Sequence, residues 1–196
     1  MVMPAPKTSL ALLLALLVAQ GASQVLFGGA CPPLKPMTYF EPNQFLGRWF
    51  EIARFFVSYE GLAGSCWVEN YYFAPKRGHF TVLEWKDHLT GRIRNIENGI
   101  VHDNKQQGLI RYELQRPNLP FLRGHYLILA TDYRRYALAW QCEDLPLGVA
   151  HTEILWFLSK DQFPDPTVTQ KVLELTKKFG LNPSHFEFQN RKGCPH

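Results

Sequence analysis

The feature that most constrains this chain is a series of eight short segments with strand-like patterns, followed by one segment with a helical pattern. The strand-like segments are rich in β-branched and aromatic residues and are separated by turns that contain glycine, proline or aspartate. They cover residues 45–55, 66–74, 79–86, 92–101, 109–115, 125–131, 135–142 and 151–160. Evenly spaced strands predict an all-β fold, an eight-stranded antiparallel up-and-down barrel that closes on itself.

The helical segment lies directly after the last strand segment. Asp165 is suited to cap a helix N-terminus, Pro166 to the first helical position, and Gly180 to the position after the last turn. The apolar stripe between them consists of Val168, Val172, Leu175 and Phe179. The last three strands are apolar on both faces, so we expect one helix to pack on the outside of the barrel.

The N-terminal residues have the layout of a secretory signal peptide. Lys7 precedes the apolar run 10–19, and the small residues Gly21, Ala22 and Ser23 follow it. We expect cleavage before Gln24, although a buried N-terminal helix is the alternative. Residues 1–23 are then a signal peptide and residues 24–196 form a single secreted, extracellular domain. Residues 24–44 contain four prolines, and we expect no regular element there.

The cysteines and the charged residues limit the function classes that fit. Four cysteines in a secreted chain favour two disulfides, and their spacing leaves all three pairings open. Neither the cysteines nor the scattered histidines have metal-ligand spacing, so we predict no metal site and no cofactor. Basic residues are dispersed, which argues against a nucleic-acid partner. Glycine-rich phosphate loops and nucleophile elbows are absent from the sequence, and we expect no catalytic residues.

Two short motifs carry a resemblance to a known family. Gly47 precedes Trp49 by two residues in the first strand segment, and Thr131-Asp132-Tyr133 ends an apolar strand about eighty residues later. Together these motifs resemble the two leading signatures of the lipocalins, above all their apolipoprotein D-like and bilin-binding branch. The resemblance extends over residues 31–194. It implies that Cys31 pairs with Cys142 and Cys66 with Cys194.

The resemblance also implies which residues form the floor and the inner wall of the barrel. Gly47 and Trp49 would lie at the floor, with Lys160 at the position where the family usually has arginine. Counting alternate residues from these anchors places Ala130 inside, and the regular alternation of 109–115 places Tyr112 on the face of Ile110. The residues expected to contact a ligand are Trp67, Glu69, Tyr71, Phe73, Val82, Glu84, Lys86, Tyr112, Tyr126, Ile128, Ala137, Ala139, Gln141, Ile154, Trp156 and Leu158.

A wall of this composition suits a rigid apolar molecule with one or two polar ends. The resemblance therefore implies a secreted carrier for a fatty acid, sterol, retinoid, carotenoid or bilin, acting as a monomer or weak homo-oligomer. One alternative is a lipocalin-type isomerase that uses Cys66 as a thiolate. The other is a module that binds a lipid particle or membrane through Phe121, Leu122 and Leu147, in two apolar loops that we expect side by side at the open end.

Overall fold

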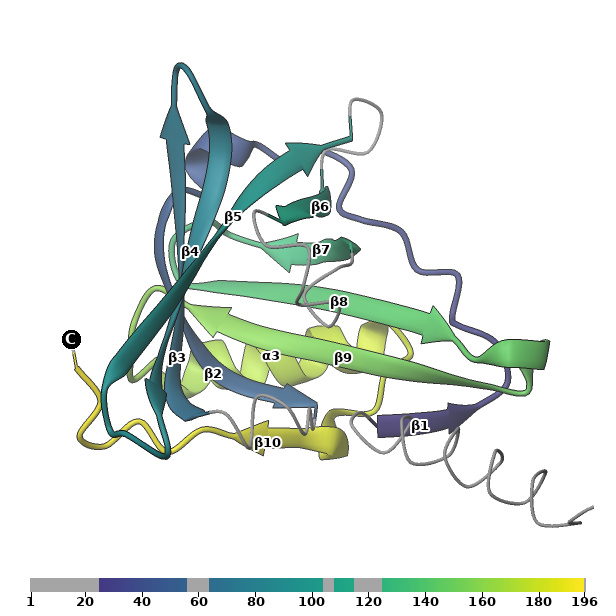
Figure 1. Cartoon of the computed structure of the whole chain (residues 1–196). Helices are drawn as coiled ribbons and strands as arrows, with labels where there is room; N and C mark the ends of the chain where they lie inside the picture. The colour runs from purple at the N-terminus through teal and green to yellow at the C-terminus, as the bar shows by residue number, and fades with distance from the viewer. Residues whose placement is uncertain (1–24, 56–63, 104–107, 115–124, 196) are drawn as a thin grey trace, which may run out of the picture.

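The computed structural model describes residues 25–55, 64–103, 108–114 and 125–195. Its barrel strands are β2 (Gly47–Phe55), β3 (Gly64–Ala74), β4 (Gly78–Asp87), β5 (Ile93–His102), β6 (Leu109–Leu114), β7 (His125–Thr131), β8 (Tyr136–Asp144) and β9 (Ala150–Ser159). Each strand pairs antiparallel with the next, and β9 also pairs with β2 (Figure 1). The predicted fold, an eight-stranded antiparallel barrel with one external helix, is confirmed.

The closing pair of strands contains an irregularity that affects the interior. Phe50 lies opposite Ser159 and Glu51 opposite Leu158, but the register then shifts, so that Ala53 faces Phe157 and Arg54 faces Trp156. A bulge of this kind places two residues of one strand against one of its partner and reverses the alternation beyond it. Glu51 and Arg54 therefore project from the same face of β2, although they are three residues apart.

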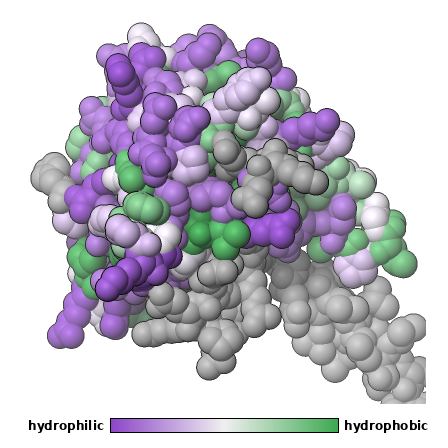
Figure 2. Space-filling model, turned by 90° about the horizontal axis from the view of Figure 1, so that it is seen from above, coloured by the Kyte–Doolittle hydropathy of each residue, from purple (hydrophilic) through white to green (hydrophobic). Residues whose placement is uncertain are grey.

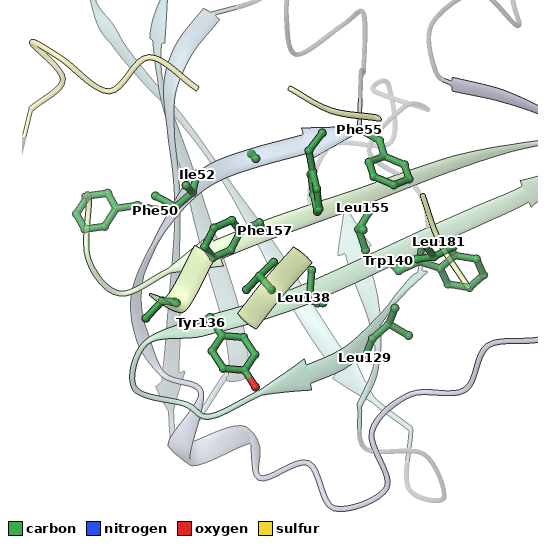
Figure 3. Packing of buried hydrophobic residues seen from close by; sticks show 14 of the residues in the cluster. Phe50, Ile52, Phe55, Leu129, Tyr136, Leu138, Trp140, Leu155, Phe157 and Leu181 are labelled. Atoms are coloured by element: carbon green, nitrogen blue, oxygen red, sulfur yellow. The ribbon is translucent and has the colours of Figure 1, made fainter. Parts of the chain in front are cut away.

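The helix α3 (Pro166–Lys178) forms where the sequence predicts it. The Asp165 side chain accepts a hydrogen bond from the Thr167 N–H at 2.8 Å, and Gly180 takes a positive φ of 76° after the last turn. Val168 and Val172 pack on a cluster of side chains from β2, β7, β8 and β9 that cover the outer wall (Figure 3). Thr176 extends this buried stripe, and its hydroxyl donates to the Val172 carbonyl at 2.9 Å. Strands β7, β8 and β9 are apolar on both faces because one face packs against the helix side of the barrel and the other lines the interior.

The expectation that residues 24–44 lack regular structure is wrong. Strand β1 (Val25–Gly28) pairs antiparallel with the first half of β9, from Glu153 to Ala150, and the 3-10 helix η1 (Pro42–Gln44) follows further along. The first half of β9 extends beyond its pairing with β2, so its edge is open for a further strand. His151 of β9 holds the end of β1 in place. Its Nδ1 lies 2.7 Å from the carbonyl oxygen of Gly29, directly after β1, and its Nε2 lies 2.9 Å from the Glu153 Oε1.

At the C-terminal end, the 3-10 helix η4 (Pro183–His185) leads into β10 (Phe186–Phe188), which pairs with the end of β2. The two disulfides that the resemblance implies are present, Cys31–Cys142 and Cys66–Cys194. They join residues 111 and 128 positions apart, so both chain ends are tied to the barrel wall. Long closed loops of this kind restrict the unfolded chain and thereby favour the folded state.

Replacing Phe157 by alanine tests the contribution of the layer between helix and barrel. Phe157 is completely buried on the outer face of β9, and removing a buried phenylalanine ring costs about 3–5 kcal/mol. We expect the free energy of unfolding, measured by urea titration, to fall by that amount. Phe163→Ala is the matched control, since its ring is 58% exposed and the change should stay within about 0.5 kcal/mol. Equal losses in the two variants would contradict this assignment.

Candidate functional site

The pairing of neighbouring strands decides which side chains face the barrel interior, because residues opposite each other project from the same face. Trp49 lies opposite Glu69, and Gly47 lies opposite Tyr71. Trp49 and Tyr71 belong to a hydrophobic cluster that unites side chains from β2, β3 and β5 to β9. Strands on all sides of a barrel can share one cluster only inside it, so this cluster identifies the inner face.

Gly47, Trp49 and Lys160 lie together at one end of the interior. The Lys160 Nζ is 4.1 Å from the centre of the Trp49 ring system and donates a hydrogen bond to the Leu46 carbonyl at 2.7 Å. Gly47 has a φ of 93°, which favours glycine, and a Cβ there would be at contact distance, 3.4 Å, from this Nζ. Burial lowers the pKa of Lys160 to about 8. An ammonium over an indole forms a cation–π contact, although without the planar stacking of an arginine.

The preceding coil plugs the same end with two buried phenylalanines. Phe45 stacks on Trp49 with ring centres 4.6 Å apart and meets Tyr71 edge-on at 4.8 Å. Phe40 packs against Phe45 at 5.1 Å, and the Trp49 Nε1 donates to the Phe45 carbonyl at 2.8 Å. The sequence places Phe45 within the first strand and gives Phe40 no role. The turn around Pro42 that precedes Phe45 is the signal that could have indicated a plug.

The expected inner-wall residues of β7, β8 and β9 share the inner face. Strands β8 and β9 bring the following pairs opposite each other: Ala137 and Leu158, Ala139 and Trp156, and Gln141 and Ile154. Strand β7 adds Ile128, which lies opposite Ala139, and Tyr126, which belongs to the inner cluster. The expectation for Ala130 is wrong, because a bulge after Ile128 pairs Ala130 with Leu138 on the outer face.

Strand β3 presents Trp67, Glu69, Tyr71 and Phe73 to the inside, as expected. Tyr71 and Tyr126 come from strands on opposite sides of the barrel, and their hydroxyl oxygens are 2.5 Å apart. The Tyr71 hydroxyl donates to the Glu69 carboxylate at 2.7 Å, so Tyr126 is the donor in the tyrosine pair. This bridge crosses the interior above the floor.

The placement of Val82, Glu84 and Lys86 on the inner wall is wrong. Tyr71 lies opposite Thr81 and Glu69 opposite Leu83, while Val82 and Glu84 are opposite the outward Asn70 and Val68. Glu84 instead forms an outer-face ion pair with Arg48 at 3.8 Å. The inward residues of β4 are Thr81, Leu83 and Trp85, and Trp85 stacks on Trp67 with ring centres 5.0 Å apart. The short turn 75–77 sets this register, because it places odd-numbered residues of β4 opposite odd-numbered residues of β3. The inward residues of β3 are odd-numbered, so those of β4 are odd-numbered as well.

A buried ion pair inside the barrel could not be foreseen from the sequence. Glu51 and Arg54 both face inwards because of the bulge in β2, and the Arg54 Nη1 bonds to the Glu51 Oε1. The two residues are 5% and 3% exposed. Burial raises the pKa of Glu51, and the Arg54 guanidinium opposes that shift. Simple alternation would place one of the two residues outside.

The inner face is filled near the floor and accessible further up. Trp49, Ile110, Ile128 and Ala137 have no exposed surface. Other inward residues keep partial exposure, namely Glu69, Leu83, Trp85, Ile96 and Trp156, although Trp67, Arg54 and Ile154 on the same face are buried. Side chains that point into a barrel can stay exposed only where solvent reaches its interior. Tyr112 is part of β6, but its side chain lies outside the described residues.

Within the same described ranges, no group of three or more histidine, cysteine or acidic side chains could hold a metal ion. All four cysteines are bonded. The arrangement can therefore offer an aromatic and aliphatic wall, a bridge of two tyrosines with a carboxylate, and a closed floor. Such a site is suited to hold an apolar molecule.

Comparisons with known proteins agree with this architecture. The model of the lipocalin / cytosolic fatty-acid binding protein family matches residues 46–192. Apolipoprotein D from Cavia porcellus is 33% identical over 188 residues, which cover 93% of this chain and 94% of that protein. Insecticyanin-B from Manduca sexta is 27% identical over 168 residues, covering 81% of this chain and 76% of that protein.

Solved structures show the same fold. The structure of insecticyanin from the tobacco hornworm Manduca sexta superposes with a TM-score of 0.77 at 24% identity, covering 88% of this chain and 93% of that one. Apocrustacyanin C2 gives a TM-score of 0.65 at 18% identity, over 87% of this chain and 93% of its own. The resemblance read from the two sequence motifs is thereby confirmed.

The titration of Lys160 gives a direct test of the floor. We expect its ε-ammonium, followed by NMR in the folded protein, to titrate at about 8 instead of 10.5. Between these values the unfolded chain holds a proton that the folded chain has lost, so the free energy of unfolding rises with pH. Lys160→Arg stays charged throughout and should lack this rise. A Lys160 pKa of about 10.5 would contradict the burial of its amine.

Proposed function

Because this chain belongs to the lipocalin / cytosolic fatty-acid binding protein family, we propose that it is a carrier that holds a small hydrophobic molecule inside its barrel. The observation that carries this proposal is the partial exposure of several inward side chains in a barrel whose floor is filled. Trp49 and its neighbours fill one end completely, whereas Trp156 and Trp85 point inwards and keep partial exposure. An eight-stranded barrel has room for one small ligand if its own side chains leave the space.

Binding needs no chemical step in this proposal. The guest transfers apolar surface from water to the aromatic wall, at about 25 cal/mol for each Å² removed. Ala137 and Ala139 on β8 have small side chains beside Trp156. They leave space in the barrel interior that larger side chains would fill. The candidate guests remain fatty acids, sterols, retinoids, carotenoids and bilins, and inward polar groups select among them.

We propose that the protein acts outside the cell. The two disulfides support this location, because such bonds persist in oxidising compartments. The expected signal segment, residues 1–23, and its cleavage site before Gln24 lie outside the described residues. No helix in the described ranges is long and apolar enough to cross a membrane. A monomer or weak homo-oligomer remains the prediction for its assembly.

The two alternatives have different support. The isomerase mechanism requires a thiolate at Cys66, but Cys66 is bonded to Cys194 and lies in a bulge whose neighbour Trp67 faces the interior. One observation supports the alternative of binding to a lipid surface. Leu147 is 95% exposed in the turn η3 (Pro146–Gly148) at the open end. Phe121 and Leu122 lie outside the described residues. On the face shown in Figure 2, hydrophobic residues form small groups among hydrophilic ones.

Tryptophan fluorescence can test ligand binding inside the barrel. The probe is an absorbing ligand such as retinol or a bilin, which quenches nearby indoles. We expect saturable quenching that falls clearly in Trp156→Phe, because Trp156 is inward and partly exposed. Trp140→Phe is the matched control, since Trp140 belongs to the outer cluster and donates to Glu153 at 3.0 Å.

Quenching that disappears only in Trp140→Phe would move the ligand to the outer wall. No saturable binding of any of the five ligand classes would contradict the carrier function as a whole.

A further inference from the structure

In the part of the chain that the structure describes, two neutral side chains on the inner wall each have a buried oxygen without a hydrogen-bond partner. Thr81 on β4 lies directly opposite Asn98 on β5, and Thr81 also lies opposite the inward Tyr71. Thr81 is fully buried and Asn98 is 4% exposed. The Thr81 Oγ1 and the Asn98 Oδ1 have no hydrogen-bond partner. Nearly all buried polar side-chain atoms have one, because a buried polar atom without a partner destabilises the folded state.

Their position connects this pair with the accessible part of the barrel. The next inward pair on the same two strands, towards the open end, is Leu83 and Ile96. Both keep partial exposure, whereas Thr81 and Asn98 are buried. The two unpartnered atoms thus lie at the boundary between the filled floor and the accessible interior. A molecule that enters the barrel from the open end would meet them with its leading end.

We propose that Thr81 and Asn98 form a subsite for the hydroxyl group of a neutral, otherwise apolar ligand that enters with this group first. This inference rests on the proposed carrier function. A hydroxyl group can donate to the Asn98 Oδ1 and accept from the Thr81 hydroxyl at the same time. Directly opposed residues have Cβ atoms about 4.5–5.5 Å apart, which lets one ligand oxygen reach both side chains.

The surrounding charges select against a carboxylate at this position. Such a group would face the Asn98 Oδ1, which is an acceptor, and would lie on the same wall as the Glu69 carboxylate. Among the described residues, the inward cations have partners of their own: Arg54 pairs with Glu51, and Lys160 donates to the Leu46 carbonyl at the floor. Arg94, which lies opposite the inward Trp85, is 3.8 Å from the Asp87 carboxylate. The tyrosine bridge directs its hydrogens towards Glu69. An alcohol therefore fits the subsite better than a fatty acid.

Three ligands with the same alkyl chain test whether the subsite prefers a hydroxyl group, an ether oxygen or a carboxylate: 1-dodecanol, 1-methoxydodecane and dodecanoate. Each competes at pH 7.4 for the protein loaded with the fluorescent probe 1-anilinonaphthalene-8-sulfonate. We expect dodecanol to displace the probe at the lowest concentration. Thr81→Val and Asn98→Leu should each weaken dodecanol by about threefold to tenfold, which corresponds to one hydrogen bond. The ether oxygen can accept from Thr81 but has no hydrogen to donate to Asn98, so Asn98→Leu should leave the ether unchanged. Asn95→Leu is the control, because Asn95 lies on the same strand and faces outwards, opposite Glu84.

The outcomes distinguish the subsite from the carrier function. Equal binding of dodecanol and its ether, or unchanged dodecanol affinity in both variants, overturns the subsite and leaves the carrier function standing. Water would then be the partner of the two atoms. Tightest binding of dodecanoate overturns the neutral-hydroxyl assignment. Thermal unfolding of each variant without ligand shows that it is folded, and failure of all three ligands to displace a bound probe contradicts the proposed function itself.

Discussion

The hydrogen-bonded closure of β2 against β9 is the constraint on which the rest of the structure depends. It converts a sheet with two open edges into a wall with an inside and an outside. The two short outer strands complete the same seam. Strand β1 covers the half of β9 that β2 does not reach, and β10 covers the end of β2, where its described pairing with β3 has ended. The disulfides hold both additions in place, so closure of the barrel also organises the chain ends.

Closure divides the apolar residues into two separate layers. The outer layer lies between the barrel and α3 (Figure 3). The inner layer gathers around Trp49. Ionisable groups occur in the inner layer, and each has a partner nearby: Glu51 has Arg54, and Lys160 has a carbonyl and an indole ring. A buried charge without a partner would be costly, so these groups are committed to the protein itself. In the proposed carrier, the neutral polar side chains are therefore the groups available to a ligand.

Much of the fold could be predicted from the sequence. The strand segments and the capped helix at Asp165 predicted the architecture, since these depend on periodicity and on residues with one strong preference. Spacing left the cysteine pairing open, and both disulfides were implied only by the resemblance to the lipocalins. Two kinds of feature were missed. Strand β1 is short and forms because an edge of β9 is open, which no local sequence pattern indicates. The plug formed by Phe40 and Phe45 depends on how the preceding coil folds back.

The errors in the candidate site have one physical origin: alternation holds only between irregularities. The bulge in β2 turns Arg54 inwards, and the bulge after Ile128 turns Ala130 outwards. On β4 both faces carry apolar side chains, so the pattern cannot reveal which one is inside, and the pairing across the turn 75–77 decides it.

That single step of register changes the expected chemistry of the ligand. A wall with Glu84 and Lys86 would favour a charged or zwitterionic guest, because each of these groups would need a counter-charge. The wall that forms instead carries Thr81, Leu83 and Trp85, and places the Thr81 hydroxyl opposite Asn98. The polar side chain that β4 contributes is therefore neutral, and Trp85 adds aromatic surface. If the proposed carrier function holds, the register of one hairpin therefore shifts the expected ligand from a charged or zwitterionic molecule to a neutral one.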